Sequence, residues 1–256
     1  MSITINYWQL LTGVFVGLAS GYLGSFMVLR RMALVGDALS HVALPGLAIA
    51  IMFHFNPFLG AFGALFIGVV GIWLVENKTN LPTESLVGLF FTSALAIGIL
   101  ITPQFDLLEA LFGDITKVSR LDALVAIALS IAVMLVMRHI AKRFILANLS
   151  PDLARSTGVR VALINFVYLL LVAAIVALGI KAVGTLLTGA LVVIPAIASR
   201  NITKSLSNYT FSSALIGLVS LVGGILLASV FGFATGPLVV LSSTVVFLIT
   251  LVLKRD

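Results

Sequence analysis

The sequence contains no cysteine and few charged residues, and each shortage excludes a class of protein. Without cysteine, disulfides, thiolate metal sites and iron–sulfur clusters are excluded. Charged residues make up 9% of the 256 residues, whereas an ordinary soluble domain carries about 25%. Because so few charges cannot cover a water-facing surface, lipid must face most of the exterior, and a soluble enzyme is excluded.

Apolar residues make up 61% of the chain and form runs long enough to cross a bilayer, which takes roughly 20 residues per helix. Backbone groups in lipid must bond to one another, so these runs are helices, since barrel strands would be about half as long. We therefore expect an all-α integral membrane protein, a single transmembrane domain over 1–256 with eight or nine helices. The breaks in hydropathy place nine spans at 8–29, 34–54, 58–75, 84–102, 121–141, 161–180, 183–203, 210–231 and 235–253. The count falls to eight if one bent helix crosses 180–184.

The distribution of Lys and Arg predicts the orientation, because cytoplasmic loops carry an excess of both. If the N-terminus lies outside, the inner side collects twelve basic residues and the outer side keeps Lys117, Arg120 and Lys181. The twelve include Lys254 and Arg255, which an odd number of spans places inside. We therefore expect an outer N-terminus and a cytosolic C-terminus. Since the net charge of +6 resides in these short loops, we expect no nucleic-acid partner.

Two ionisable residues, Asp37 and His41, stand within the second predicted span. A carboxylate there costs about 2.5–3.5 kcal/mol on insertion scales and rarely stays unpaired. Four residues apart on a helix, the two side chains share a face, and a carboxylate with an imidazole suits a borderline divalent cation. A hydrogen bond that holds two helices together would also explain the pair, but the membrane setting favours a functional role.

One Asp–His pair has too few ligands for a metal site, because zinc takes four and manganese up to six. A two-fold dimer would bring two pairs together and supply four ligands. The pair therefore hints at a homodimer with the metal on its axis. Two carboxylates and two imidazoles accept zinc, manganese or iron, so these residues leave the metal open.

Two other features have two interpretations each. Pro45 removes a backbone hydrogen bond within the second span, and carbonyls freed at such breaks often line transport paths, although helix packing alone could explain a kink. The segment 103–120 carries Asp106, Glu109 and Asp114 and has few basic residues. It could dock a partner or attract cations at the outer face, or it could be a solvated loop.

The longest predicted inner loop, 147–160, has the signals of a short helix. Ser150 precedes Pro151 and Asp152, which is typical of a helix start, and Gly158 is typical of a helix end. Such a helix could transmit motion to a cytosolic partner, or it could simply connect two spans. The sequence contains no Gly-Lys pair and hence no phosphate-binding loop, so any ATP that drives transport must bind another subunit.

Several blocks of the sequence carry a family resemblance. The most specific is Leu29-Arg30-Arg31-Met32 followed by Gly36-Asp37-Ala38-Leu39-Ser40-His41. The supporting blocks are Leu111-Phe112-Gly113-Asp114, Ser150-Pro151-Asp152-Leu153-Ala154 with Gly158, and Val183-Gly184-Thr185-Leu186-Leu187 followed by Ile194-Pro195-Ala196. In this order, and over nearly the whole chain, they resemble the permease subunits of bacterial zinc/manganese ABC importers.

The resemblance implies a transport subunit without enzymatic activity in a bacterial or archaeal cytoplasmic membrane. It implies a homodimer that works with two cytosolic ATPase subunits and an extracytoplasmic metal-binding protein. Zinc or manganese would be the cargo, with iron as a further candidate, and no cofactor would be bound permanently. Asp37 and His41 would hold or gate the metal during alternating access, and Pro45 and Pro195 would shape the pore.

The resemblance also assigns a role to the short inner helix, which would sit in a groove on the ATPase. Its coupling residues would be Asp152, Ala154 and Gly158, and the Ala-x-x-x-Gly spacing agrees with the coupling loops of ABC importers. Leu153 and Arg155 depart from the more common Glu-Ala-Ala form of these loops, whereas the position of the loop in the chain agrees.

The depth of the metal site conflicts with a simple count of residues. If the second helix begins near Leu34, Asp37 lies only about 5 Å and His41 about 10 Å inside the inner boundary, at 1.5 Å per residue. The family role places them deeper. Either residues 30–37 enter the bundle as non-helical backbone, or the gate lies nearer the cytosol.

Three other functions are compatible with a polytopic membrane protein. A proton-coupled secondary carrier could use the same pair for metal, but 147–160 would then have no partner. A permease for a siderophore or cobalamin is usually longer and needs no Asp–His pair for a caged metal. A scaffold without transport would give Asp37 and His41 no reason to stand in a span.

Overall fold

The computed structural model describes residues 7–79, 81–101 and 119–254, and every regular element within them is an α-helix. The first five helices are α1 (Tyr7–Leu29), α2 (Ala33–Val42), α3 (Leu44–Met52), α4 (Pro57–Thr79) and α5 (Thr83–Ile101). They are followed by α7 (Arg120–Leu149), α8 (Pro151–Ser156), α9 (Val161–Val183), α10 (Thr188–Ile202), α11 (Leu206–Phe231) and α12 (Thr235–Val252).

Eight spans in the described residues are long and apolar enough to cross a membrane, which confirms the predicted all-α membrane fold. One of them, Ala33–Met52, consists of α2 and α3 together. The ninth predicted span corresponds to α10, which is apolar but has only 15 residues. The predicted acidic segment with Asp106, Glu109 and Asp114 lies outside the described residues, apart from its last two positions.

The predicted break at 180–184 lies between two separate helices, so a single bent helix does not cross it. After Val183 the chain passes through Gly184, whose φ of +84° is a left-handed conformation that glycine adopts without steric cost. Thr188 then packs against Gly179 of the preceding helix, so the chain has turned back on itself. Residues 184–187 are therefore non-helical backbone between α9 and α10, and Thr185 there is fully buried.

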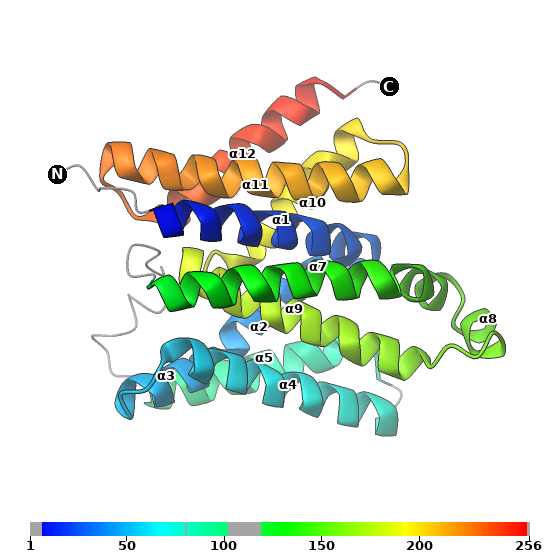
Figure 1. The fold of residues 1–256 in the computed structure, drawn as a ribbon. Helices are drawn as coiled ribbons and strands as arrows, with labels where there is room; N and C mark the ends of the chain where they lie inside the picture. Colours follow the sequence, from blue (N-terminus) through cyan, green and yellow to red (C-terminus); the bar gives the residue numbers. More distant parts are fainter. Residues whose placement is uncertain (1–6, 80, 102–118, 255–256) are drawn as a thin grey trace.

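The long helices lie side by side, and the two ends of the bundle differ (Figure 1). The short helix α8 and the end of α12 lie at the right in this view, and α1 begins at the left. We call the end of the bundle that carries α8 the α8 end. At the α8 end α7 continues to Leu149, eight residues beyond its predicted apolar limit at 141.

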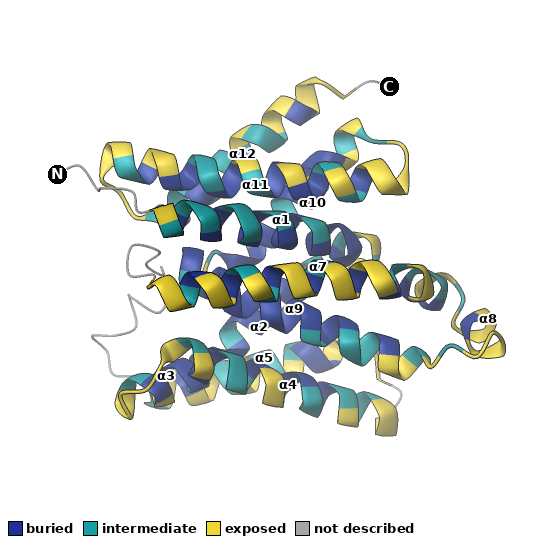
Figure 2. Cartoon of the chain, viewed as in Figure 1, coloured by how far each residue is buried: buried dark blue, intermediate teal, exposed yellow. Residues whose placement is uncertain are grey.

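The centre of the bundle is formed by α1, α2, α9 and α10, whereas α5, α7 and α12 expose large apolar side chains (Figure 2). Small residues let neighbouring helices of the bundle approach closely in lipid. A Cβ added at Gly17 of α1 would lie 2.7 Å from the carbonyl oxygen of Gly217 in α11. Packing of this kind leaves the outward apolar faces for lipid.

Candidate functional site

Asp37 and His41 both lie on α2, halfway along the bundle. The ring of His41 is 5.4 Å from that of Phe91, which is near the middle of α5. Val42 lies against Gly68, the central residue of α4. The pair therefore lies much deeper than a count from the start of its helix suggests.

The depth arises because the turn before α2 is itself inside the bundle. α1 ends at Leu29, and the guanidinium of Arg30 sits over the rings of Phe144 in α7 and Tyr168 in α9. Tyr168 is seven residues into α9, about 10 Å from its start at the α8 end. The expectation of non-helical backbone over 30–37 is correct only for 30–32, because α2 begins at Ala33.

One side of α2 packs on the non-helical segment before α10. The hydroxyl of Ser40 lies 2.6 Å from the carbonyl oxygen of Thr185 and 2.7 Å from that of Asp37. Gly189, in the first turn of α10, stands against Asp37: a Cβ added there would lie 2.7 Å from the Asp37 Cβ and 3.0 Å from its Oδ1. The N-terminus of α10, which carries partial positive charge, therefore lies next to the side chain of Asp37.

The other side of α2 is open. Leu34 is 82% exposed, Asp37 is exposed and His41 is half-buried, so the predicted shared face is present. The Nδ1 atom of His41 is buried and has no hydrogen-bond partner among the described residues. Both side chains contact other helices, His41 through Phe91 and Asp37 through Gly189, but neither forms a side-chain hydrogen bond to another described helix. The interpretation as a purely structural hydrogen bond therefore has no support in the geometry.

One chain does not complete a metal site by itself within its described part. No group of three or more His, Cys, Asp and Glu side chains gathers there. Two ligands on one exposed helical face can hold a metal ion only if further ligands come from outside the chain, since zinc takes four and manganese up to six.

Of the two prolines predicted to shape a pore, one stands at a break between helices and the other lies within a continuous helix. Pro45 is the second residue of α3 and marks the break of the second span into α2 and α3. Gly98 of α5 lies against Pro45. Pro195 is buried inside α10, seven residues after Thr188.

The predicted short helix is α8, and its capping agrees with the sequence signals. The Ser150 hydroxyl accepts a hydrogen bond from the backbone N–H of Leu153 at 3.4 Å. Ala154 is fully buried, whereas Asp152 is exposed and pairs with Arg155 at 3.5 Å. Gly158 has φ of +80°, which ends the helix in a conformation that glycine favours.

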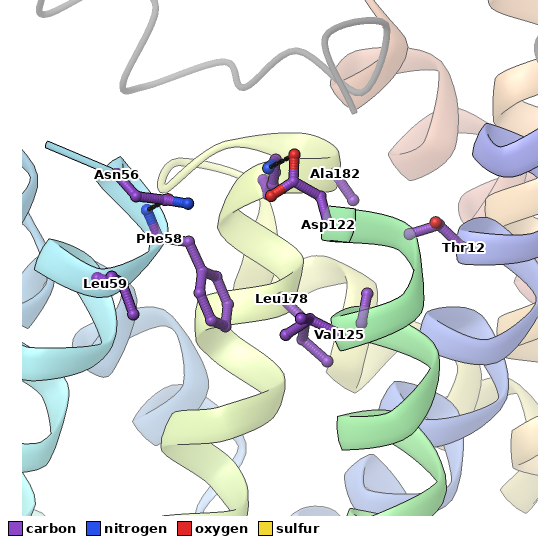
Figure 3. Close-up of a pocket in the computed structure, with 10 residues that line it drawn as sticks. Thr12, Asn56, Phe58, Leu59, Asp122, Val125, Leu178 and Ala182 are labelled. Carbon is purple, nitrogen blue, oxygen red and sulfur yellow. Dashed lines mark hydrogen bonds and ion pairs between the residues drawn. The ribbon is translucent and has the colours of Figure 1, made fainter. Parts of the chain in front are cut away.

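A cavity of about 150 Å³ lies among the first residues of α4 and α7 and the last residues of α9 (Figure 3). It is therefore at the end of the bundle opposite α8 (Figure 1), and neither Asp37 nor His41 lines it. It is lined mainly by apolar side chains of α4, α7 and α9. At its rim the Nζ of Lys181 lies 2.7 Å from the Oδ2 of Asp122, which also accepts from the backbone N–H of Ser119 in a capping box. The pair ties the adjacent ends of α7 and α9 together.

Sequence reasoning missed the roles of Arg30, Asp122 and Lys181. Arg30 and Arg31 stand next to each other and both fit an inner loop, so no sequence signal separates the half-buried Arg30 from the exposed Arg31. Ser119 followed by Asp122 is a recognisable helix start, but its salt bridge to Lys181 depends on the packing of α7 against α9.

Known proteins resemble this chain over nearly its whole length. The family model described as ABC 3 transport family matches residues 2–254. The manganese transport system membrane protein MntC of Listeria innocua is 32% identical over 94% of this chain and 87% of its own length. The high-affinity zinc uptake system membrane protein ZnuB of Haemophilus influenzae is 30% identical over 98% of both chains.

A solved structure confirms the likeness of fold. A chain in the structure of PsaBC from Streptococcus pneumoniae in complex with Fab superimposes with a TM-score of 0.82 at 26% identity. The match covers 97% of this chain and 92% of that chain.

Proposed function

The chain belongs to the ABC 3 transport family, and we propose that it is the membrane permease of an importer that carries manganese or zinc ions. Proteins of this family are multi-pass membrane subunits, and a separate subunit hydrolyses the ATP. The family resemblance read from the sequence is therefore confirmed. The curated relatives include both manganese and zinc systems, so both ions are proposed as cargo. Family membership also sets aside a secondary carrier and a scaffold.

The observation that carries the site proposal is the exposure of Asp37 on a face of α2 at the middle of the bundle. A carboxylate is expensive in lipid, so this face must meet protein or water. A second copy related by a two-fold axis would cover the face and bring its own Asp and His. Two carboxylates and two imidazoles then replace the water around one divalent ion.

The transport cycle we propose is alternating access at this paired site. A metal-binding protein delivers the ion from outside, and the two Asp37–His41 pairs hold it at the dimer axis. The Nδ1 of His41 is unpaired in the described chain, so a metal bound by this imidazole would have to break no hydrogen bond there. Movement of α8, driven by the ATPase subunits, then opens the path towards the α8 end, which we place in the cytosol.

The test is metal uptake into vesicles that contain the permease with its ATPase, supplied with the metal-binding protein. We expect Asp37→Asn and His41→Ala each to lower ATP-driven uptake of manganese or zinc by at least about tenfold. Both variants should still assemble with the ATPase. His54→Asn is the matched control, because His54 lies at the end of α3 with φ of +54°, which asparagine tolerates.

Two outcomes contradict the proposal. Uptake by Asp37→Asn at the wild-type rate means that the ligand assignment is wrong. Wild-type uptake that needs a proton gradient and no ATP means that the protein is a secondary carrier.

A further inference from the structure

The turn between α1 and α2 contains two unfavourable features. The Nη1 atom of Arg30 is buried and has no hydrogen-bond partner in the described part of the chain. The next residue, Arg31, has φ of +61°, a left-handed conformation that residues with a Cβ seldom adopt. A buried unpaired donor and a strained backbone both cost free energy, and such costs concentrate where a segment changes arrangement. Residue 33, directly after this turn, begins the helix that carries Asp37 and His41.

Arg30 is held by a cage of aromatic rings. Its guanidinium carbon lies 5.5 Å from the ring centre of Phe144 and 5.6 Å from that of Tyr168, within the range of cation–π attraction. The two rings are 4.3 Å apart, and Phe26 meets Phe144 edge-on at 6.1 Å. Phe144 and Tyr168 are both fully or almost fully buried. The side chain of Arg30 is therefore attached to α7 and α9 and not only to its own turn.

These two helices are the ones that α8 joins at its end of the bundle (Figure 1). Ser150 is both the residue after α7 and the N-cap of α8. Phe144 is five residues before the end of α7 at Leu149, and Tyr168 is seven residues after the start of α9 at Val161. A displacement of α8 must pass through these short helical stretches, and both lead to the rings around Arg30.

The charge of Arg30 extends the connection to the other side of the bundle. The carboxylates of Glu76 in α4 and Glu84 in α5 interact favourably with the guanidinium. Glu76 also accepts a hydrogen bond from the Thr83 hydroxyl at 2.6 Å, which joins α4 to the start of α5. Helices α4 and α5 are those that pack against Val42 and His41.

We infer that Arg30 is a positioning residue through which movement of α8 reaches the metal pair on α2. The inference rests on the proposed function and adds a defined route to it: α8, the aromatic pair of α7 and α9, Arg30, and then α2. Arg30 touches no metal in this scheme. It transmits movement of the rings of α7 and α9 to α2.

The test compares uptake of metal with hydrolysis of ATP in the reconstituted transporter. We expect Arg30→Ala to lower the metal carried per ATP hydrolysed by about tenfold, while ATP hydrolysis and assembly with the ATPase persist. Arg30→Lys keeps the charge but loses the planar group, so its ratio of metal carried to ATP hydrolysed should lie between those of Arg30→Ala and the wild type. Arg143→Ala is the control, because it removes an exposed arginine directly beside Phe144 and should leave the ratio unchanged.

A second measurement separates positioning from damage to the metal site. Binding of manganese or zinc to the nucleotide-free permease should be the same for Arg30→Ala and the wild type. If Arg30→Ala does not assemble, Phe144→Leu removes one ring of the cage, keeps an apolar side chain, and should lower the ratio in the same direction.

The inference is overturned if Arg30→Ala carries as much metal per ATP as the wild type. It is also overturned if uptake and hydrolysis fall in parallel, or if the metal no longer binds. Failure of the wild type to take up metal with ATP would contradict the proposed function itself, which makes the two failures distinguishable.

Discussion

Asp37 packs against Gly189, and this contact is possible because glycine has no side chain. Gly189 lies in the first turn of α10, and the carboxylate and Cβ of Asp37 occupy the space where another residue would place its Cβ. The contact involves the backbone as well, since an added Cβ would lie 3.0 Å from the Asp37 Cα. A flexible side chain could move away, but a helix backbone cannot do so without shifting α2.

We therefore expect Gly189→Ala to displace Asp37 and to lower both metal affinity and uptake by about tenfold, as loss of a positioning contact does. The measurement is metal binding by the purified permease together with uptake in vesicles. Gly88→Ala in α5 is the matched control, since no atom lies within 4 Å of a Cβ added there. That control should bind metal normally and gain slightly in stability, by about 0.5–1 kcal/mol. Equal metal binding by both variants would show that Asp37 tolerates a change in its packing.

The spacing of Asp37 and His41 predicts a shared helical face, because residues four apart on a helix are neighbours. Their contacts were not predictable in the same way. Ser40 directly precedes His41, but its hydroxyl bonds to Thr185, which is 145 positions away in the sequence. The burial of Arg30 depends on two aromatic rings from distant helices. Local pattern therefore identifies the Asp37–His41 pair as the candidate ligands, and tertiary packing supplies what positions them.

At the scale of helices, hydropathy predicts well which segments form membrane helices, but it predicts poorly how deep in the bundle a helix begins. Each of the nine predicted spans overlaps a helical segment, and most ends agree within a few residues. The depth of α2 was misjudged because the count began at an assumed membrane boundary. The turn at 30–32 lies inside the bundle, where rings cover a guanidinium that would otherwise reach the surface. Hydropathy cannot reveal that the turn lies inside the bundle, because an arginine has the same hydropathy value whether it is covered by protein or exposed.

The short helix α8 has one face in the bundle and another that is free. Ala154 is fully buried, whereas Leu153 is 53% exposed. An exposed leucine next to exposed charges suits a surface that another protein covers. This arrangement fits the proposed docking of α8 on the ATPase.

We expect Leu153→Asp to weaken association with the ATPase by at least about tenfold, as truncation of an apolar anchor at an interface does. The measurement is the affinity between detergent-solubilised permease and the isolated ATPase subunit. Leu253→Asp is the control, because Leu253 is 63% exposed at the same end of the bundle but follows α12. If both substitutions leave the affinity unchanged, α8 is only a connection between α7 and α9.

The whole molecule exposes apolar side chains on most sides, as a protein surrounded by lipid should. The face of α2 differs, because a carboxylate and an imidazole stand there beside the exposed Leu34. Asp152 of α8 is exposed too, but it lies at the end of the bundle, where charge is tolerated. A second copy on the α2 face would cover the carboxylate and complete the ligand set, which is why the shortage of ligands in one chain favours a dimer.

The lack of cysteine makes this dimer directly testable, since any introduced thiol is the only one in its chain. A two-fold axis brings the same residue of both copies near each other, so Leu34→Cys should form a disulfide-linked dimer when membranes are oxidised. Such a bond needs Cα atoms within about 7 Å, and a short bismaleimide linker extends the reach if they are farther apart. Val230→Cys is the control, because Val230 is 77% exposed on α11, away from α2. Addition of manganese or zinc should raise the yield for Leu34→Cys, since the metal joins the two pairs. If both variants cross-link at the same slow rate, the α2 face is not the dimer axis, and the ligands that complete the site must come from elsewhere.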